Sequence, residues 1–268
     1  MPETLRLLWG TLTLRPYVFI FLAVYLFLAI TTIGWKRTLL YSCIAYFIAF
    51  SCEWCSIRYG FPFGQYYYIP ATIDKELWIA GVPFMDSLSF TFLSYVSYEL
   101  AVLLRSPLRI LRWEVRLISN EKLRRSYWTS LLAGLLMTYL DIIIDPVALQ
   151  GERWFLGKIY YYPNEGDYFG VTIANFVGWY IVCVFIIRTY TFLESKLKAD
   201  TAGILEYRFK PLGVVGLYFG ILIFNLSMTF HIGEKTMGWA GVFITILLAL
   251  LVIMHVSNCS RYFRGEQG

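Results

Sequence analysis

Seven stretches of the chain stay predominantly apolar for about 20 residues, the length that an α-helix needs to cross the hydrocarbon core of a bilayer. Polar and charged residues gather in the connections between these stretches. The pattern predicts an all-α, polytopic integral membrane bundle of about seven transmembrane helices that forms a single domain over residues 1–268. The predicted spans are 17–34, 38–57, 84–104, 127–149, 171–193, 211–230 and 238–257.

The composition agrees with a membrane protein and limits the chemistry. Charged residues make up 15% of the chain, against about 25% in soluble domains. Histidine-rich di-iron desaturases and hydroxylases are excluded, because imidazole holds their iron and this chain has only His231 and His255. Neither a dinucleotide-binding fingerprint nor a P-loop is present. Gly213, Gly216 and Gly220 are instead predicted to be points of close approach between packed helices.

Lys and Arg are distributed unequally between the two sides that the spans would separate. The side with the 105–126 connection and the C-terminus carries 16 of them, and the other side carries 7. Because cytoplasmic connections are enriched in Lys and Arg, the N-terminus is predicted to lie outside and the C-terminus in the cytoplasm. The net charge of +5 therefore indicates topology, and no nucleic-acid partner is expected.

The most basic connection has an arginine pattern of its own. Arg105, Arg109, Arg112 and Arg116 recur at helical spacing. This stretch is predicted either as an amphipathic helix that lies on anionic lipid or as a solvated charged loop.

Two other connections, 58–83 and 150–170, are long, aromatic and rich in glycine and proline. In the predicted orientation both lie on the non-cytoplasmic face. Tyr and Trp favour the membrane interface, where the ring is apolar and the polar atom is hydrated. Both connections are therefore predicted to form an interfacial lid, which could also cover the mouth of a lipophilic site.

Carboxylates inside the predicted spans indicate a functional site. An ionised acid at the centre of a bilayer costs about 2.5–3.5 kcal/mol even on lenient insertion scales, so such groups need a proton, a cation or one another. Glu53, Asp86, Asp141 and Asp145 lie towards the outer ends of the second, third and fourth spans, and Asn175 opens the fifth. Four helices thus present polar groups at a similar depth.

The fourth span gives the sharpest pattern. Asp141 and Asp145 are four residues apart and share a helix face. Pro146 cannot donate an amide hydrogen bond, so the Ile142 carbonyl is expected to be a further acceptor near the pair. Glu99 lies deeper in the third span and is not expected to join the group. A single acid of this kind is often a structural hydrogen bond between helices, but several that converge favour a functional site.

Such a cluster suits acid-initiated chemistry. Carboxylates in a low dielectric cannot all ionise, so at least one is expected to stay protonated and to act as a Brønsted acid. Aromatic faces stabilise cations, so the acid could protonate an electron-rich alkene. Capture of the cation by water would make the protein a hydratase, and loss of a proton would make it a cyclase or isomerase. The substrate would be a polyene or isoprenoid dissolved in the membrane.

Three segments resemble one known family. Glu53, the run Tyr-Gly-Phe-Pro-Phe-Gly-Gln-Tyr-Tyr-Tyr over 59–68, and Gly-Val-Pro over 81–83 resemble the E…GxPFGxYxY…GVP pattern of the membrane carotenoid biosynthesis family. The D…DPVA run over 141–148 and the YFGV…NFVGW run over 168–179 resemble two further motifs of that family. The resemblance covers about residues 40–190 and departs at Thr172, where the family has proline. Residues 195–268 carry no matching motif.

The resemblance implies a carotenoid 1,2-hydratase type of hydro-lyase that adds water to the terminal double bond of an acyclic carotenoid without a cofactor or metal. Asp141 or Asp145 would donate the proton, and the other, with Glu53, would orient water or accept its proton. Asp86 and Asn175 would contribute hydrogen bonds. The implied surroundings are a prokaryotic cell membrane, its lipid bilayer and other carotenoid enzymes. The candidate cation-stabilising or substrate-binding aromatics are Trp54, Phe63, Tyr66 and Trp179.

Three alternatives stay open. The spacing of Asp141 and Asp145 also suits Mg²⁺ in a membrane prenyltransferase, although the outer side is poor in the Lys and Arg that a diphosphate needs. A carotenoid cyclase would use the same cation. A seven-span carrier or receptor would be the non-enzyme alternative.

Overall fold

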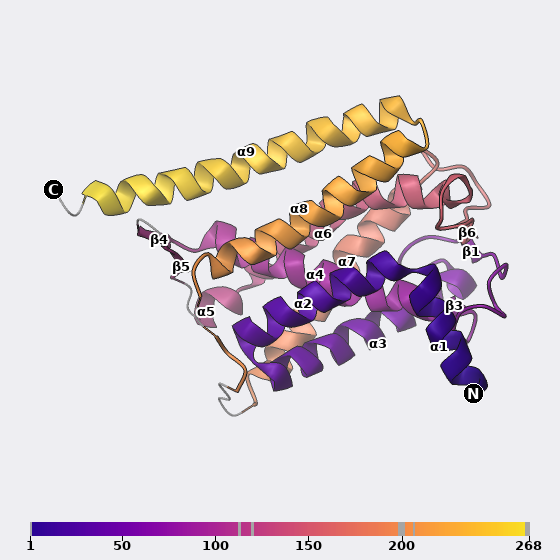
Figure 1. The fold of residues 1–268 in the computed structure, drawn as a ribbon, viewed down its shortest axis with the longest axis horizontal. Helices are drawn as coiled ribbons and strands as arrows, with labels where there is room; N and C mark the ends of the chain where they lie inside the picture. The colour runs from indigo at the N-terminus through magenta and orange to yellow at the C-terminus, as the bar shows by residue number, and fades with distance from the viewer. Residues whose placement is uncertain (1, 112–113, 119–120, 198–201, 206, 266–268) are drawn as a thin grey trace.

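The computed structural model describes the chain except residues 1, 112–113, 119–120, 198–201, 206 and 266–268. Seven of the described helices are long and apolar enough to cross a membrane, and each coincides with one predicted span. The predicted all-α membrane bundle is therefore confirmed (Figure 1). These helices are α2 (Pro16–Ile33), α3 (Trp35–Tyr59), α4 (Phe84–Arg105), α6 (Tyr127–Leu149), α7 (Ile173–Glu194), α8 (Lys210–His231) and α9 (Lys235–Gly265).

Short elements cap the two ends of the bundle. We call the end with α1 and the two aromatic connections the loop end, and the end with the β4–β5 hairpin the hairpin end (Figure 1). The short elements are α1 (Glu3–Leu14), β1 (Tyr67–Tyr68), β2 (Trp78–Ile79), β3 (Val82–Pro83), β4 (Leu108–Leu111), β5 (Glu114–Leu117), α5 (Glu121–Arg124), the 3-10 helix η1 (Gly151–Arg153) and β6 (Tyr160–Tyr161).

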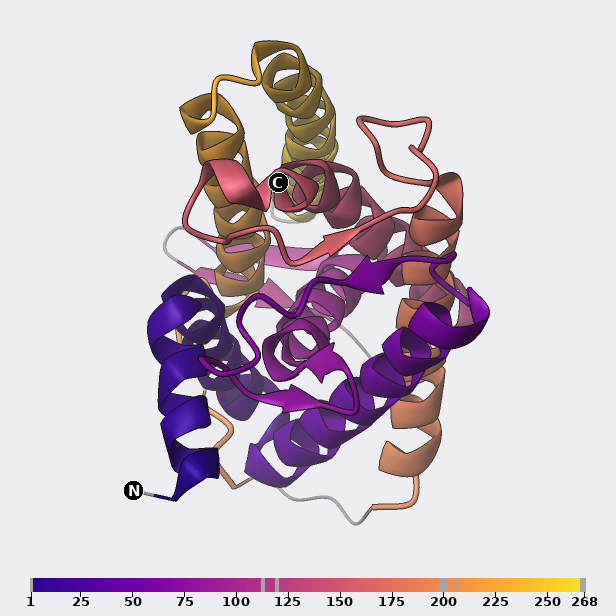
Figure 2. The same ribbon diagram turned by 90° about the vertical axis from the view of Figure 1, so that its right-hand side faces the viewer.

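Helix α4 is the central helix of the bundle. Viewed along the bundle from the loop end, the other helices surround it (Figure 2), and every residue from Phe90 to Leu103 is buried. Most of its serine and threonine hydroxyls donate to carbonyls of the same helix: Ser94 donates to the Phe90 carbonyl at 2.5 Å and Ser97 to the Leu93 carbonyl at 2.8 Å. Because these side chains are short, neighbouring helices can pack closely on α4 without unpaired polar groups.

The hairpin end corrects one prediction. Residues 105–116 do not form the predicted amphipathic helix, because most of this stretch belongs to the antiparallel pair β4 and β5. Leu108 and Val115 are buried while Arg109 and Arg116 are exposed, an alternation with the period of two that a strand has. The spacing of the arginines fitted a helix, but the buried positions follow the strand. Arg112 lies outside the described residues.

The charged groups at the hairpin end largely neutralise one another. Glu99 pairs with Arg124 and so stays apart from the other intramembrane acids. Glu194 forms ion pairs with Arg125 at 2.9 Å and with Arg37 at 3.2 Å. The acids at the loop end have a different environment.

The glycines of α8 meet different surroundings at different heights. A Cβ on Gly213 would come within 2.7 Å of Leu28 on α2, so the predicted close approach is confirmed there. It is wrong for Gly216 and Gly220, because no atom that a Cβ would meet lies within 4 Å of either position. Helices α2 and α8 therefore touch near the hairpin end and separate towards the loop end.

At the loop end, a buried ion pair joins three segments. Arg15, between α1 and α2, donates to both carboxylate oxygens of Glu76 at 3.1 and 3.3 Å and also to the Leu156 carbonyl. Neither member of the pair is more than 1% exposed. The chain before α2 and both aromatic connections are thus held together at one point.

Candidate active site

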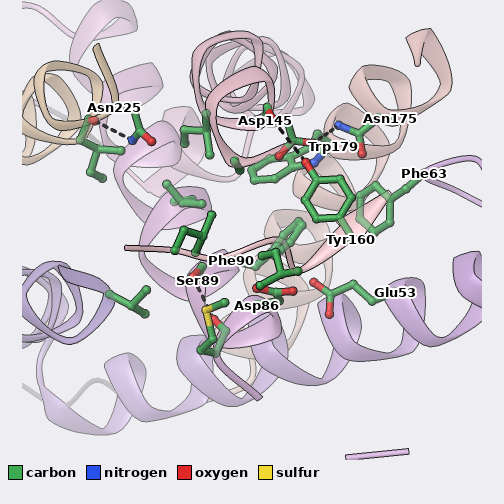
Figure 3. Close-up of a pocket in the computed structure, with 18 of the residues that line it drawn as sticks. Glu53, Phe63, Asp86, Ser89, Phe90, Asp145, Tyr160, Asn175, Trp179 and Asn225 are labelled. Carbon is green, nitrogen blue, oxygen red and sulfur yellow. Dashed lines mark hydrogen bonds between the residues drawn. The ribbon is translucent and has the colours of Figure 1, made fainter. Parts of the chain in front are cut away.

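A cavity of about 140 Å³ lies among the helices at the loop end, beneath the two aromatic connections (Figure 3). Its wall includes carboxylate or amide groups from four helices: Glu53 on α3, Asp86 on α4, Asp145 on α6 and Asn175 on α7. Among the candidate aromatics, Phe63, Tyr66 and Trp179 also line it. The structure thus brings together seven of the nine residues singled out from the sequence.

Asn175 links the two aspartates of α6. Its amide nitrogen donates to Asp141 Oδ2 at 2.8 Å and to Asp145 Oδ2 at 2.6 Å. Both aspartates lie on one face of α6, a helix that continues past Pro146. Asp145 lines the cavity, whereas Asp141 lies outside its wall and is completely buried. Asp141 Oδ1 has no hydrogen-bond partner. A single amide group therefore serves a pair of carboxylates that differ in access to the cavity.

A second acid pair faces the cavity from α3 and α4. Glu53 is 3% exposed, and its Oε2 accepts a hydrogen bond from the Ser87 hydroxyl at 2.7 Å. Asp86, in the first turn of α4, lies beside it (Figure 3). The Tyr68 hydroxyl lies next to both acids and is a hydrogen-bond partner of each. Burial and then the negative charges of Asp86 and Glu53 raise the pKa of Tyr68 well above its usual value.

The two aromatic connections meet through two Tyr-Tyr-Tyr runs, 66–68 and 160–162. Strands β1 and β6 pair antiparallel, with Tyr67 opposite Tyr161 and Tyr68 opposite Tyr160. The middle tyrosines are exposed, and the flanking ones line the cavity, as the alternation of a strand requires. We call the four inward residues, Tyr66, Tyr68, Tyr160 and Tyr162, the tyrosine cluster.

The hydroxyl groups of the tyrosine cluster lie over the acids. Tyr66 donates to Tyr68 Oη at 3.4 Å, and Tyr160 donates to the main-chain carbonyl of Asp145 at 3.4 Å. Burial, followed by the charge of Asp145, raises the pKa of Tyr160 and of Tyr162 well above the usual value for tyrosine. These phenols stay protonated at neutral pH and can donate or accept hydrogen bonds over the cavity.

Aromatic rings form the wall between the two acid pairs. The rings of Phe90 and Trp179 lie 4.6 Å apart, and those of Phe63 and Phe90 lie 5.7 Å apart. Trp54 is not part of this wall. Its ring lies under the guanidinium of Arg58 at 4.2 Å, outside the cavity.

The four carboxylates are not paired with a base in the part of the chain that the structure describes. Among the same described residues, no three His, Cys, Asp or Glu side chains converge as a metal-binding group. Ionised acids in such surroundings are costly. The arrangement is therefore suited to holding and transferring protons.

Several cavity residues were missed from the sequence. Asn225 on α8 lies at the far side of the cavity and donates to its own helix at the Ile221 carbonyl, 2.9 Å away. The repeated Tyr-Tyr-Tyr run was a usable signal for the pairing of the two connections. Phe90 in the cavity wall and Ser87, which donates a hydrogen bond to Glu53, carried no such signal, because aromatic and small residues are common in packed membrane helices. The other missed residues that line the cavity include Tyr17, Phe21 and Trp154.

Comparison with known proteins gives one match. A model of the family described as carotenoid biosynthesis protein matches residues 14–255. No curated protein and no solved structure matches the chain.

Proposed function

Because the chain belongs to the carotenoid biosynthesis protein family, we propose that its contribution to that pathway is the addition of water to the terminal double bond of an acyclic carotenoid. One observation carries the proposal. A membrane-embedded cavity with aromatic walls holds carboxylates that form no salt bridge among the described residues. Such a cavity suits protonation of an alkene better than it suits binding of an anionic group.

Asp145 is the proton donor in this proposal, because it lines the cavity while Asp141 lies behind it. Two adjacent carboxylates cannot both ionise in a low dielectric without a cation, so the pair keeps at least one proton. The substrate ends in (CH₃)₂C=CH–. Its π electrons take the proton of Asp145 to form a C–H bond at the CH carbon, which leaves a tertiary cation on the dimethyl carbon.

The rings of Phe63, Phe90 and Trp179 line the same cavity as Asp145, and in this proposal they stabilise the cation. A cation over a desolvated aromatic face gains about 2 kcal/mol or more. Water then adds to the cation, and Glu53 or Asp86 accepts the proton that the water loses. The net reaction consumes one water, restores the number of protons in the site and gives a tertiary alcohol.

Expression in a lycopene-producing host, with mass analysis of the pigments, tests the proposal. A product heavier than lycopene by the mass of one or two waters is expected, and Asp145→Asn should lower its yield by about 100-fold or more, the usual size of a general-acid contribution. Asp167→Asn, an exposed aspartate in the second connection, is the matched control and should leave the yield unchanged.

Other outcomes identify the alternatives. A cyclised product of unchanged mass would indicate a carotenoid cyclase. Loss of activity on chelation with EDTA would indicate the metal-dependent prenyltransferase. Movement of a solute across sealed vesicles without a product would indicate the carrier.

A further inference from the structure

The cavity is sealed by direct contacts on most of its sides. Between α6 and α7, Asn175 bonds to both aspartates. Between α3 and α4, Ser87 bonds to Glu53. Between α3 and α7, Phe63 fills the space, since a Cβ on Gly178 would come within 2.6 Å of its ring. A bulky substrate has no passage on these sides.

The side between α2 and α8 is different. The two helices touch at Gly213 and Leu28 near the hairpin end, but Gly216 and Gly220 face open space. Nearer the loop end, both helices contribute to the cavity wall, α2 through Tyr17 and α8 through Asn225. The helices therefore diverge where the cavity lies.

Aromatic rings close this divergence, and we call those of Tyr17, Phe21 and Phe224 the aromatic gate. Trp154 and Phe155 of the second connection pack against Tyr17 and Phe224. Tyr17 stacks on Phe224 at 5.1 Å, and Phe21 meets Phe224 edge-on at 5.6 Å. Tyr17 and Phe21 line the cavity, whereas Phe224 lies outside the cavity lining and is half-buried. The gate is thus two rings deep, with its inner layer on α2 and its outer layer on α8. Ring contacts of this kind open by rotation of side chains on a fast timescale.

We infer that the gap between α2 and α8 is the lateral portal through which a long polyene enters from the bilayer, with its tail held by the aromatic gate. The inference rests on the proposed function. A cavity of about 150 Å³ can hold benzene, so this cavity of about 140 Å³ takes one end group of the substrate. The rest of the chain must stay in lipid, because each methylene moved into water costs about 0.8 kcal/mol.

A second opening on the lipid side is the rival route. An apolar groove of about 530 Å³ lies among α2, α3 and α4 and has Leu22, Phe47 and Leu88 in its lining. It shares no lining residue with the acid cavity, and none of the four carboxylates lines it. The portal between α2 and α8 is the one that leads to the acids.

Reversible closure of the portal tests the inference. Cysteines replace Phe21 and Phe224, and a short bifunctional methanethiosulfonate reagent links them through disulfides that a reductant releases. The induced circular dichroism of lycopene added to the purified protein reports binding, and mass analysis reports the hydrated product. Linking should slow binding by about tenfold or more, equal to about 1.4 kcal/mol in the barrier, and reductant should restore the rate.

The matched control is the pair Phe27→Cys and Tyr207→Cys, whose rings lie 6.2 Å apart near the hairpin end. Linking this pair should leave binding unchanged. Phe224→Ala alone should speed binding, and it keeps the test decisive if the double variant does not fold. Unchanged binding in the linked gate variant, or in Phe224→Ala, would overturn the portal. Lycopene that binds the unmodified protein without gaining water would overturn the hydratase proposal and leave the portal standing.

Discussion

Asn175 holds the two aspartates of α6 together, and its replacement should separate catalysis from packing. Asn175→Leu keeps nearly the same volume and removes hydrogen bonds of 2.8 and 2.6 Å to Asp141 and Asp145. A hydrogen bond to a charged group contributes about 1.5–3 kcal/mol. If one of the two carboxylates is ionised, the loss is one bond of this strength and one neutral bond of about 1 kcal/mol. We therefore expect a loss of about 3 kcal/mol, or roughly 100-fold in kcat.

Asn225→Leu is the matched control for this change. Both asparagines are buried and line the same cavity, but Asn225 donates to the Ile221 carbonyl of its own helix. The same substitution there alters the volume equally and leaves the acids untouched. We expect it to change kcat by less than about fivefold, since an isolated side-chain hydrogen bond contributes about 1 kcal/mol.

The assay is the rate of hydrated carotenoid formation by the purified protein, with the thermal unfolding midpoint measured for each variant. We expect a low kcat with little change in KM for Asn175→Leu. Equal losses of activity in the two leucine variants would refute this expectation, because the shared amide would then matter no more than any buried asparagine.

Four further changes have expected outcomes. Arg15→Met leaves Glu76 buried without its ion-pair partner and should lower the free energy of unfolding by about 3–5 kcal/mol, whereas the double change with Glu76→Leu should recover much of the thermal unfolding midpoint. The four tyrosines of the cluster have raised pKa values in the folded state. Their contribution to the free energy of unfolding is therefore fully present below pH 10. Above that pH the unfolded chain loses protons that the folded chain keeps, and melting curves should show stability falling by up to about 1.4 kcal/mol per pH unit for each tyrosine. Trp179→Leu should lower kcat about 30-fold, the equivalent of about 2 kcal/mol of cation stabilisation, while Trp54→Leu outside the cavity should not. A reporter fused to the C-terminus should be active in the cytoplasm, and a non-cytoplasmic signal would reverse the orientation derived from Lys and Arg.

The spans were predictable because the bilayer imposes a length and a composition on each helix separately. The fourth predicted span, 127–149, coincides with α6 (Tyr127–Leu149) even though Pro146 lies inside it. The acids were also predictable as a group, since an unpaired carboxylate in a membrane is rare enough to be informative wherever it occurs. The spans and the acids could both be predicted from the residues of each segment alone, without knowledge of its contacts with other segments.

Features that depend on contacts between distant segments were not accessible in this way. The strands β1 and β6 have two residues each, too few to show a period, and they pair across more than 90 positions. Trp54 follows Glu53 directly in the sequence, yet consecutive residues point in different directions on a helix, so only Glu53 faces the cavity. In the stretch 105–117 the arginines fit the period of a helix and the buried residues fit the period of a strand. The contacts of this stretch with the bundle decide between the two.

The cavity wall has two chemically different sides, and the proposed reaction would use both. Hydration consumes one water molecule, which comes from the aqueous phase, and one polyene, which is dissolved in the lipid. The tyrosine cluster presents hydroxyl groups on the side of the loop connections, while Tyr17, Phe21 and Phe224 present rings on the side of α8. Water that enters beneath the tyrosines would reach Glu53 and Asp86 first, next to Tyr68. A polyene that enters between α2 and α8 would bring its end group to the aromatic wall beside Asp145. In the proposed reaction, separate entry of the two reactants would keep bulk water away from the cation, so that a single water bound by the acids would be the one that adds.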